Sequence, residues 1–419
     1  MSTPPARAIR AVFTPTDNKE LKEVLDEIQY TILFPALLPI EKQKILFDPS
    51  KKEYLEENPI VIEVENQEFR LKPLDRINGI ENSGKLFIRA LEKMNTPDDW
   101  SNLETLLAGY KKARVKLPAK HRGKILRLAR HGGNIQPVIE CIKQWEETGF
   151  TMANREVACR LFALNNERIY RNAADPQMAI RAWGHSVMLM DLLSRPEHSL
   201  KVTDPSDRLL NYRLIRGMHV YALCSAINAK KMAGEDIDQD MSNLRNEVSL
   251  IMPLWEENML DKMEEIPELR RLNPSVERFG GLKKPTGYAK ALNGYAFVGV
   301  LAQNIRGMEL AMELLGDDAR YLQKVHDAIE KYLGEFARTS IGLRSTWNEE
   351  YESITGRSPD WPAWVGPDEL IAAMEERMKA AAALKAATEG TAVVDAVDDQ
   401  VSKGDTDETH QEAAAEESR

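Results

Sequence analysis

The residues whose types and spacing could do chemistry carry positive charge and lie in one stretch. Between Thr105 and Val138 the chain holds no aspartate or glutamate. The lysines and arginines of this basic segment are Lys111, Lys112, Arg114, Lys116, Lys120, Arg122, Lys124, Arg127 and Arg130. Such a run attracts phosphate groups through Coulomb forces and counterion release. The segment therefore predicts a surface for a polyanion such as RNA. The alternative interpretation is a solvated helix face, or a face paired with acids elsewhere in the fold.

No second set of residues has the spacing of a catalytic or metal site. None of the 7 histidines stands four residues from another histidine or a cysteine, as a metal site on a helix requires. The nucleophile, zinc-protease, phosphate-loop and dinucleotide motifs are also absent from the sequence. The 3 cysteines lack CxxC spacing and are expected to be buried thiols. The sequence therefore predicts no catalytic residue, no metal ligand and no cofactor, and a protein that is not an enzyme.

Two amphipathic helices are expected to position the second half of the basic segment. Residues 120–131 and 135–147 both place apolar residues at helical spacing. Gly132-Gly133 separates the two helices, and Gly149 stands where a helix usually ends. A helix pair of this length cannot bury its own apolar face, so stacked neighbours must cover it.

A near-repeat of 35 residues links this helix pair to the sequence before it. A shift of that length brings Tyr110 onto Trp145 and Val115 onto Phe150. Residues 118–152, with helix, glycine turn, helix and the exit Gly-Phe-Thr-Met, are similar to a pentatricopeptide repeat. The resemblance extends in part to residues 100–117 and is of a degenerate, fungal mitochondrial type.

The resemblance implies an all-α fold, a right-handed α-solenoid of degenerate helix–turn–helix repeats of the pentatricopeptide and tetratricopeptide kind. This family is mostly organellar, binds single-stranded RNA and includes components of mitochondrial ribosomes. Arg122 and Met152 occupy the positions that usually read bases, and neither suits hydrogen bonding to a base edge. Recognition of phosphates and shape is therefore expected instead of base reading.

Outside the repeat, the sequence predicts a small N-terminal β-hairpin. Residues 60–64 and 69–71 alternate apolar and polar side chains, with Asn66-Gln67 between them. An isolated hairpin is marginal, so it should pack on helices. No apolar run reaches the ~18 residues of a membrane span. The net charge of −10 is uneven, because the residues after Ala387 are strongly acidic.

Composition and breaks divide the chain into six segments. They are 1–17 (a targeting or disordered segment), 18–98 (a helix and the hairpin), 99–273 (helical repeats), 274–287 (a Gly/Pro loop), 288–386 (further helices) and 387–419 (a disordered acidic tail). Arg7 and Arg10, with no acid before Asp17, have the composition of a mitochondrial presequence. Together with the resemblance, they predict a protein of the mitochondrial matrix.

The predicted function is non-enzymatic work in organellar gene expression. The protein would be associated with the mitochondrial ribosome or would bind transcripts. Its expected partners are RNA, single-stranded or ribosomal, and proteins of a ribonucleoprotein or assembly complex. The alternative is a protein-only scaffold or assembly factor for a respiratory-chain complex, in which the basic segment would meet an acidic protein.

Overall fold

Most of the chain is placed by the computed structural model, which describes residues 9–75, 82–131, 135–200, 208–276, 291–340, 344–365 and 379. The predictions for residues 1–8, for the Gly132-Gly133 turn, for most of the 274–287 loop and for the acidic tail lie outside these ranges. Residues 1–361 form one unit and residues 362–419 a second one. The six finer segments stay predictions.

The described residues are mostly helical. The helices are α1 (Lys19–Ile28), α2 (Phe34–Leu37), α3 (Ile40–Leu46), α4 (Lys52–Glu57), α5 (Ser83–Lys93), α6 (Pro97–Ser101), α7 (Leu103–Lys112), α8 (Ala119–His131), α9 (Gln136–Lys143), α10 (Trp145–Thr148), α11 (Arg155–Arg171), α12 (Pro176–Ser194), α13 (Arg213–Ala233), α14 (Asp238–Ile251), α15 (Pro267–Leu272), α16 (Gly294–Leu315), α17 (Leu322–Thr339) and α18 (Arg344–Thr355). A π-helical turn, Gln29–Leu33, joins α1 to α2. The strands are β1 (Ile60–Val64) and β2 (Gln67–Leu71). The predicted all-α class with a small hairpin is confirmed.

Local sequence signals explain where several helices begin and end. The side chain of Asn154 accepts a hydrogen bond from an amide of the first turn of α11 and so caps that helix. Asp175 caps α12, which has Pro176 at its first position. Gly149 ends α10 in the left-handed conformation with φ of 68°, as predicted.

The hairpin belongs to a small N-terminal group of elements. β1 and β2 pair antiparallel, and Glu65 and Asn66 make the turn with φ of 52° and 63°. The second strand therefore starts at Gln67, earlier than the predicted Phe69, because the turn uses residues 65 and 66. A separate small core holds the hairpin against α2 and α3. Its buried members are Phe34, Leu38, Leu46, Val64 and Leu71.

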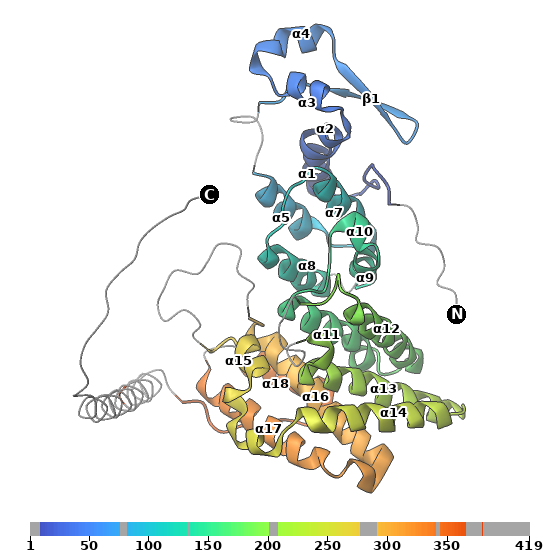
Figure 1. Ribbon diagram of the computed structural model, residues 1–419, viewed down its shortest axis with the longest axis vertical. Helices are drawn as coiled ribbons and strands as arrows, with labels where there is room; N and C mark the ends of the chain where they lie inside the picture. The colour runs from blue at the N-terminus through green and yellow to red at the C-terminus, as the bar shows by residue number, and fades with distance from the viewer. Residues whose placement is uncertain are drawn as a thin grey trace, which may run out of the picture. The chain divides into compact units, whose positions relative to one another are not determined.

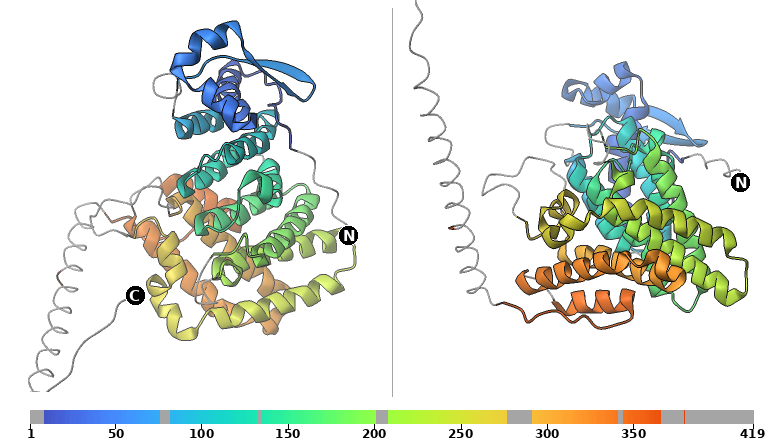
Figure 2. Two further views of the ribbon diagram at one scale, coloured as in Figure 1. Left: turned by 45° about the horizontal axis from the view of Figure 1, so that its top comes forward. Right: turned by 60° about the horizontal axis from the view of Figure 1, so that its bottom comes forward.

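The helices of the first unit pack partly in chain order. α5, α8 and α11 follow one another, each in contact with the next, while α7 contacts α9 and α10 (Figure 1). α16 then returns to pack against α11 and α13, and α18 covers α16. Figure 2 shows from two other sides that the hairpin lies beside α2, α3 and α4. The basic segment therefore lies between the N-terminal elements and the helices that α16 joins.

Glycines allow the closest of these helix contacts. A Cβ on Gly217 of α13 would lie 1.8 Å from Oδ1 of Asn304 on α16. Gly307 of α16 faces the backbone of α13, with its Cβ position 3.0 Å from the carbonyl oxygen of Gly217. The missing side chains let α13 and α16 approach each other's backbone.

In the described part of the chain, no helix has the length and hydrophobicity that crossing a bilayer requires.

Candidate nucleic-acid interface

Four cations of the basic segment lie at the surface between α7 and α8. They are Lys112, Arg114, Lys116 and Lys120, and all four are exposed. No ion pair joins any of them to a described carboxylate. We call these four residues the open cations. Their charge is uncompensated within the described structure, so it is available to an anionic partner.

Lys111 has a role within the fold. Its Nζ donates to the carbonyl oxygens of Trp145 and Glu146, and it lies 5.9 Å from the centre of the Trp145 ring. Both carbonyls belong to the short helix α10, and that of Trp145 also accepts from the amide of Gly149 at 2.8 Å. Lys111 thus ties the end of α7 to α10.

The first turns of α8 hold two groups that are partly buried. Burial lowers the pKa of Arg122, and no ion pair links Arg122 to another described residue. His121 stacks against Phe87, with 6.0 Å between ring centres. Burial, then the charges of Lys120 and Lys124, lowers the pKa of His121. His121 is therefore neutral near pH 7 and adds no charge to the interface.

Two further cations of α8 pair with carboxylates of neighbouring helices. Lys124 forms an ion pair with Glu92 of α5. Nη1 of Arg127 lies 2.5 Å from Oε1 of Glu156 on α11, whose side chain is 1% exposed. Gly123 makes room for this pair, since its Cβ would lie 2.6 Å from Oε2 of Glu156. These two cations hold α8 against α5 and α11.

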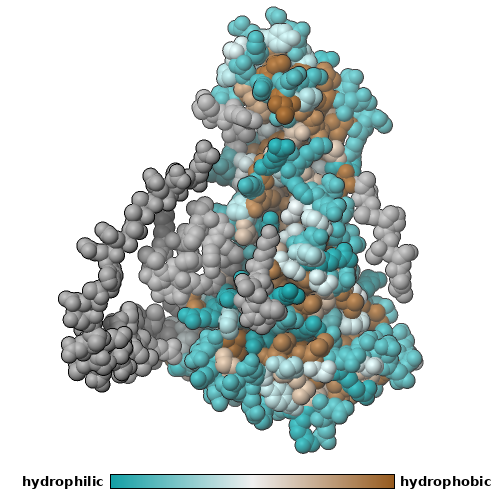
Figure 3. All heavy atoms as spheres, in the orientation of Figure 1, coloured by the Kyte–Doolittle hydropathy of each residue, from teal (hydrophilic) through white to brown (hydrophobic). Residues whose placement is uncertain are grey.

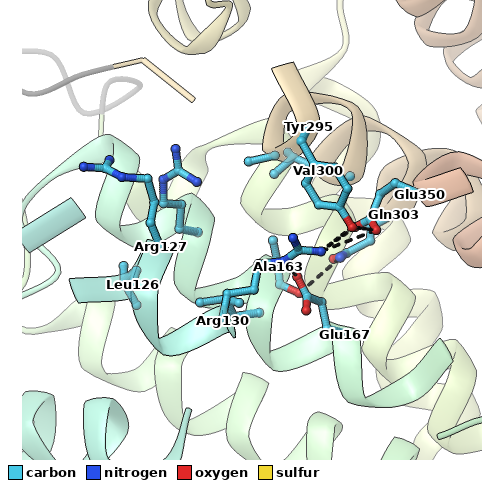
Figure 4. A pocket seen from close by; sticks show the side chains of 13 residues that line it. Leu126, Arg127, Arg130, Ala163, Glu167, Tyr295, Val300, Gln303 and Glu350 are labelled. Carbon is cyan, nitrogen blue, oxygen red and sulfur yellow. Dashed lines mark hydrogen bonds and ion pairs between the residues drawn. The ribbon is translucent and has the colours of Figure 1, made fainter. Parts of the chain in front are cut away.

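Arg130 lies at the centre of a buried polar cluster (Figure 4). It pairs with Glu167 of α11, donates to the hydroxyl of Tyr295 on α16, and lies 3.4 Å from Glu350 of α18. The guanidinium carbon is 4.0 Å from the centre of the Tyr295 ring. The cavity among these side chains measures about 30 Å³, room for a water and not for an organic ligand. The cluster joins four helices that are far apart in the sequence.

Glu350 is the member of this cluster that titrates near neutrality. Burial raises its pKa to about 7, which Arg130 opposes and Glu167 reinforces. The hydroxyl of Tyr170 donates to Glu350 at 2.9 Å, and that of Tyr295 donates as well. A carboxyl in such surroundings accepts hydrogen bonds whether or not it is charged, so the cluster stays bonded on either side of its pKa.

The structure thus divides the nine predicted cations into three groups. The open cations face solvent, Lys111 and Arg122 lie against the fold, and Lys124, Arg127 and Arg130 are paired with carboxylates. The paired carboxylates, Glu92, Glu156 and Glu167, come from outside the acid-free window. A signal was present on α11, where Glu156, Arg160 and Glu167 fall on one face of the helix.

A cluster elsewhere in the structure has the residue types of a metal site. The ligand atoms of Glu309, His326 and Glu330 all lie within 4.8 Å of one another. Arg357 pairs with both glutamates, and Nη1 of Arg306 lies 3.0 Å from Oε2 of Glu309. Hydrogen bonds from His326 and both arginines outweigh burial and lower the pKa of Glu309 to about 2. The two guanidinium groups already supply the positive charge that a metal ion would bring.

Fold and interface together define an all-α protein with a basic, solvent-facing segment next to helices that are joined by buried ion pairs. The model of the mitochondrial ribosomal protein mS27 family matches residues 1–354. The chain belongs to this family. It is also similar to the small ribosomal subunit protein mS27 of Neurospora crassa, with 30% identity over 162 residues. That match covers 38% of this chain and 41% of the length of the relative.

Family membership confirms two predictions made from the sequence. The protein is mitochondrial, of the matrix, and it is a member of a family of mitochondrial ribosomal proteins, which act in organellar gene expression. The pentatricopeptide resemblance stays a prediction, because the matching family is named for the ribosomal protein and not for the repeat. The predicted RNA-binding residues stay a prediction as well.

Proposed function

We propose that this chain is a structural, non-catalytic component of the mitochondrial small ribosomal subunit that binds ribosomal RNA by its phosphates. The observation that carries the proposal is the set of open cations, which are exposed and unpaired among the described residues. The matching family is ribosomal, and the relative is named a small ribosomal subunit protein. Lysine and arginine contacts to phosphate supply most of the affinity in such interfaces.

Binding would depend on shape and charge more than on base identity. Met152, at a position that reads bases in pentatricopeptide proteins, is buried, and its amide donates to Nδ1 of His198 at 3.3 Å. Arg122, at the other such position, is half-buried. Neither residue presents a side chain suited to a base edge, so phosphate contacts position the protein on RNA that is already folded.

We also propose that the middle of the chain is a short, degenerate solenoid of the pentatricopeptide kind. The pairs α8 with α9–α10 and α11 with α12 follow in chain order, and α8 contacts α11. Their order matches helix–turn–helix units that bury their apolar faces against each other. The return of α16 onto α11 and α13 closes this stack against further repeats.

Salt-dependent RNA binding tests the proposed function. The full chain is titrated against a fluorescently labelled single-stranded RNA at several KCl concentrations. One variant reverses the open cations: Lys112→Glu, Arg114→Glu, Lys116→Glu and Lys120→Glu. The control makes the same charge change at exposed cations that form no ion pair with a described residue: Lys231→Glu, Lys262→Glu, Arg270→Glu and Lys331→Glu.

The expected result is a log–log salt slope whose size falls by about 3 in the open-cation variant, since each phosphate contact contributes about 0.7 on single strands. The control variant should keep most of the wild-type slope. A wild-type slope near zero at about 0.1 M salt would contradict the proposal and favour the protein-only scaffold. Equal losses in the two variants would contradict the assignment to the open cations.

A further inference from the structure

A cleft of about 540 Å³ lies beside two of the open cations, Lys112 and Arg114. The proposed function assigns no ligand to this cleft. One wall comes from the π-helical turn, α2 and α3, and includes Pro35, Ile40 and Phe47. The opposite wall is the end of α7 with Lys112 and Arg114. The start of α5 contributes polar groups, among them Ser83. The cleft therefore has an apolar side facing a cationic side.

The two walls are held at a fixed separation by a close contact outside the cleft. A Cβ on Gly109 of α7 would lie 2.4 Å from Cγ of Leu33, so the π-helical turn packs directly on the helix backbone. Turns of this kind occur often at functional sites. Because the contact lies one turn before Lys112, the apolar wall is positioned relative to the two cations.

The end of α7 has an unusual conformation at the rim of the cleft. Arg114 adopts φ of 57°, and the amide of the next residue, Val115, donates to the carbonyl of Tyr110 at 2.9 Å. Glycine is the usual residue at such a helix end, since a Cβ makes the left-handed conformation costly. Local structure alone would favour glycine at position 114. The arginine found there places a cation at the rim of the cleft.

The electrostatics of the cleft suit an anion. None of the described residues that line it is an aspartate or glutamate, and Lys112 and Arg114 form no ion pair with a described carboxylate. The first turn of α5 carries no acidic side chain to offset its positive end. Asn82 accepts from the amides of Gly84 and Lys85 there. Asn82 takes up these two donors, so the helix start adds its dipole, and not these amides, to the charge of the cationic wall.

One part of the apolar wall is open to solvent, whereas Pro35 is buried. Ile40 is 72% exposed although it lines the cleft. Figure 3 shows hydrophobic residues gathered at the surface over the N-terminal elements. An occupant that satisfies both walls has an anionic group and a flat apolar group a few ångströms apart. A nucleotide has this chemistry, and the volume lies within the range of small-ligand sites.

We propose that this cleft binds a single nucleotide splayed out of the RNA, its base against Ile40 and Phe47 and its phosphate between Lys112 and Arg114. The inference rests on the proposed function. Single-stranded, unstacked nucleotides are the parts of RNA that proteins bind in pockets. Lys112 and Arg114 continue into Lys116 and Lys120 along one stretch of chain, which favours RNA over an acidic peptide as occupant.

Photocrosslinking of the full chain tests the site. The probe is a uridine dodecamer that carries 4-thiouridine, and crosslinked peptides are mapped by mass spectrometry. Crosslinks are expected in residues 31–47 and 112–115. Ile40→Asp should remove the crosslinks in 31–47 and weaken binding about tenfold. The control Met232→Asp, at a residue 82% exposed on α13, should change affinity less than twofold. Circular dichroism confirms that both variants are folded.

The outcomes separate the inference from the function on which it rests. Salt-dependent binding with crosslinks confined to residues 116–124 would overturn the nucleotide site and leave the proposed function standing. No binding of the dodecamer at any salt concentration would overturn both. Binding of an acidic, leucine-containing peptide that Ile40→Asp abolishes, without RNA crosslinks in 31–47, would overturn the nucleotide and assign the cleft to protein.

Discussion

Arg130→Met provides a stability test of the division between paired and open cations. The substitution keeps much of the side-chain volume and removes the positive charge from the cluster around Glu350. Glu167 keeps an ion pair with Arg171 at 3.0 Å, whereas Glu350 loses the cation that contacts it among the described residues. The side chain of Glu350 is 6% exposed, so bulk solvent cannot replace the charge of the arginine.

The size of the effect depends on pH in a way that the structure fixes. Burial raises the pKa of Glu350 from 4.5 to about 7. Between pH 4.5 and about 7, Glu350 is therefore protonated in the folded protein and ionised in the unfolded chain. The contribution of Glu350 to stability falls as pH rises through this range. Without Arg130 the folded-state pKa rises further, so the loss continues above pH 7.

At pH 8 the wild-type carboxylate is charged, while the variant must keep Glu350 protonated. Each pH unit over which a proton is retained costs about 1.4 kcal/mol. The variant therefore loses about 1 kcal/mol more stability at pH 8 than at pH 6, where Glu350 is protonated in both proteins. The lost hydrogen bonds to Glu167 and Tyr295 add about 1–3 kcal/mol at either pH.

The assay is urea unfolding followed by circular dichroism at pH 6 and pH 8. Glu350→Gln is the matched background, because the same Arg130→Met change made on it should cost an equal amount at both pH values. Lys124→Met, which breaks a partly exposed pair with Glu92, should cost less than about 1 kcal/mol. If Arg130→Met destabilises the wild type no more at pH 8 than at pH 6, the assignment of Arg130 to this cluster is refuted.

Two other predictions concern packing and the thiols. Gly109→Ala should destabilise the fold by about 1–3 kcal/mol, because its Cβ would collide with Leu33. Gly184→Ala, where nothing lies within 4 Å of the new Cβ, should instead stabilise by about 0.5–1 kcal/mol, and thermal denaturation compares the two. The three cysteines are buried, and burial raises their pKa values. Native protein should therefore not react with Ellman's reagent, whereas urea-unfolded protein should release three equivalents of thionitrobenzoate. Fast labelling of the native protein would contradict that placement.

Helical spacing and capping residues predicted much of the fold. The helices predicted over residues 120–131 and 135–147 are present as α8 and as α9 with α10, and Gly149 ends α10 as predicted. Within residues 288–386, predicted only as further helices, α16 runs without a break from Gly294 to Leu315. Gly307 lies in this helix and makes a close contact with α13, which only the packed structure shows.

The candidate interface was predicted less completely, because ion pairing is a property of the folded state. The absence of acids around Arg127 in the sequence does not reveal Glu156, which lies 29 residues further along the chain. In the folded protein, Glu156 on α11 pairs with Arg127 on α8. The cleft was also missed, since Ile40 and Lys112 are far apart in the sequence. The sequence shows which charged residues could contact a partner. Which of them remain exposed and unpaired depends on the folded structure.

The central claim is that the open cations contact RNA in the assembled particle. Ultraviolet crosslinking in intact mitochondria, followed by purification of the tagged chain and mapping of its RNA-bound peptides, measures this directly. Crosslinked peptides are expected from residues 112–120. Recovery of RNA only on peptides from α13 to α18, with residues 112–120 unmodified, would contradict it.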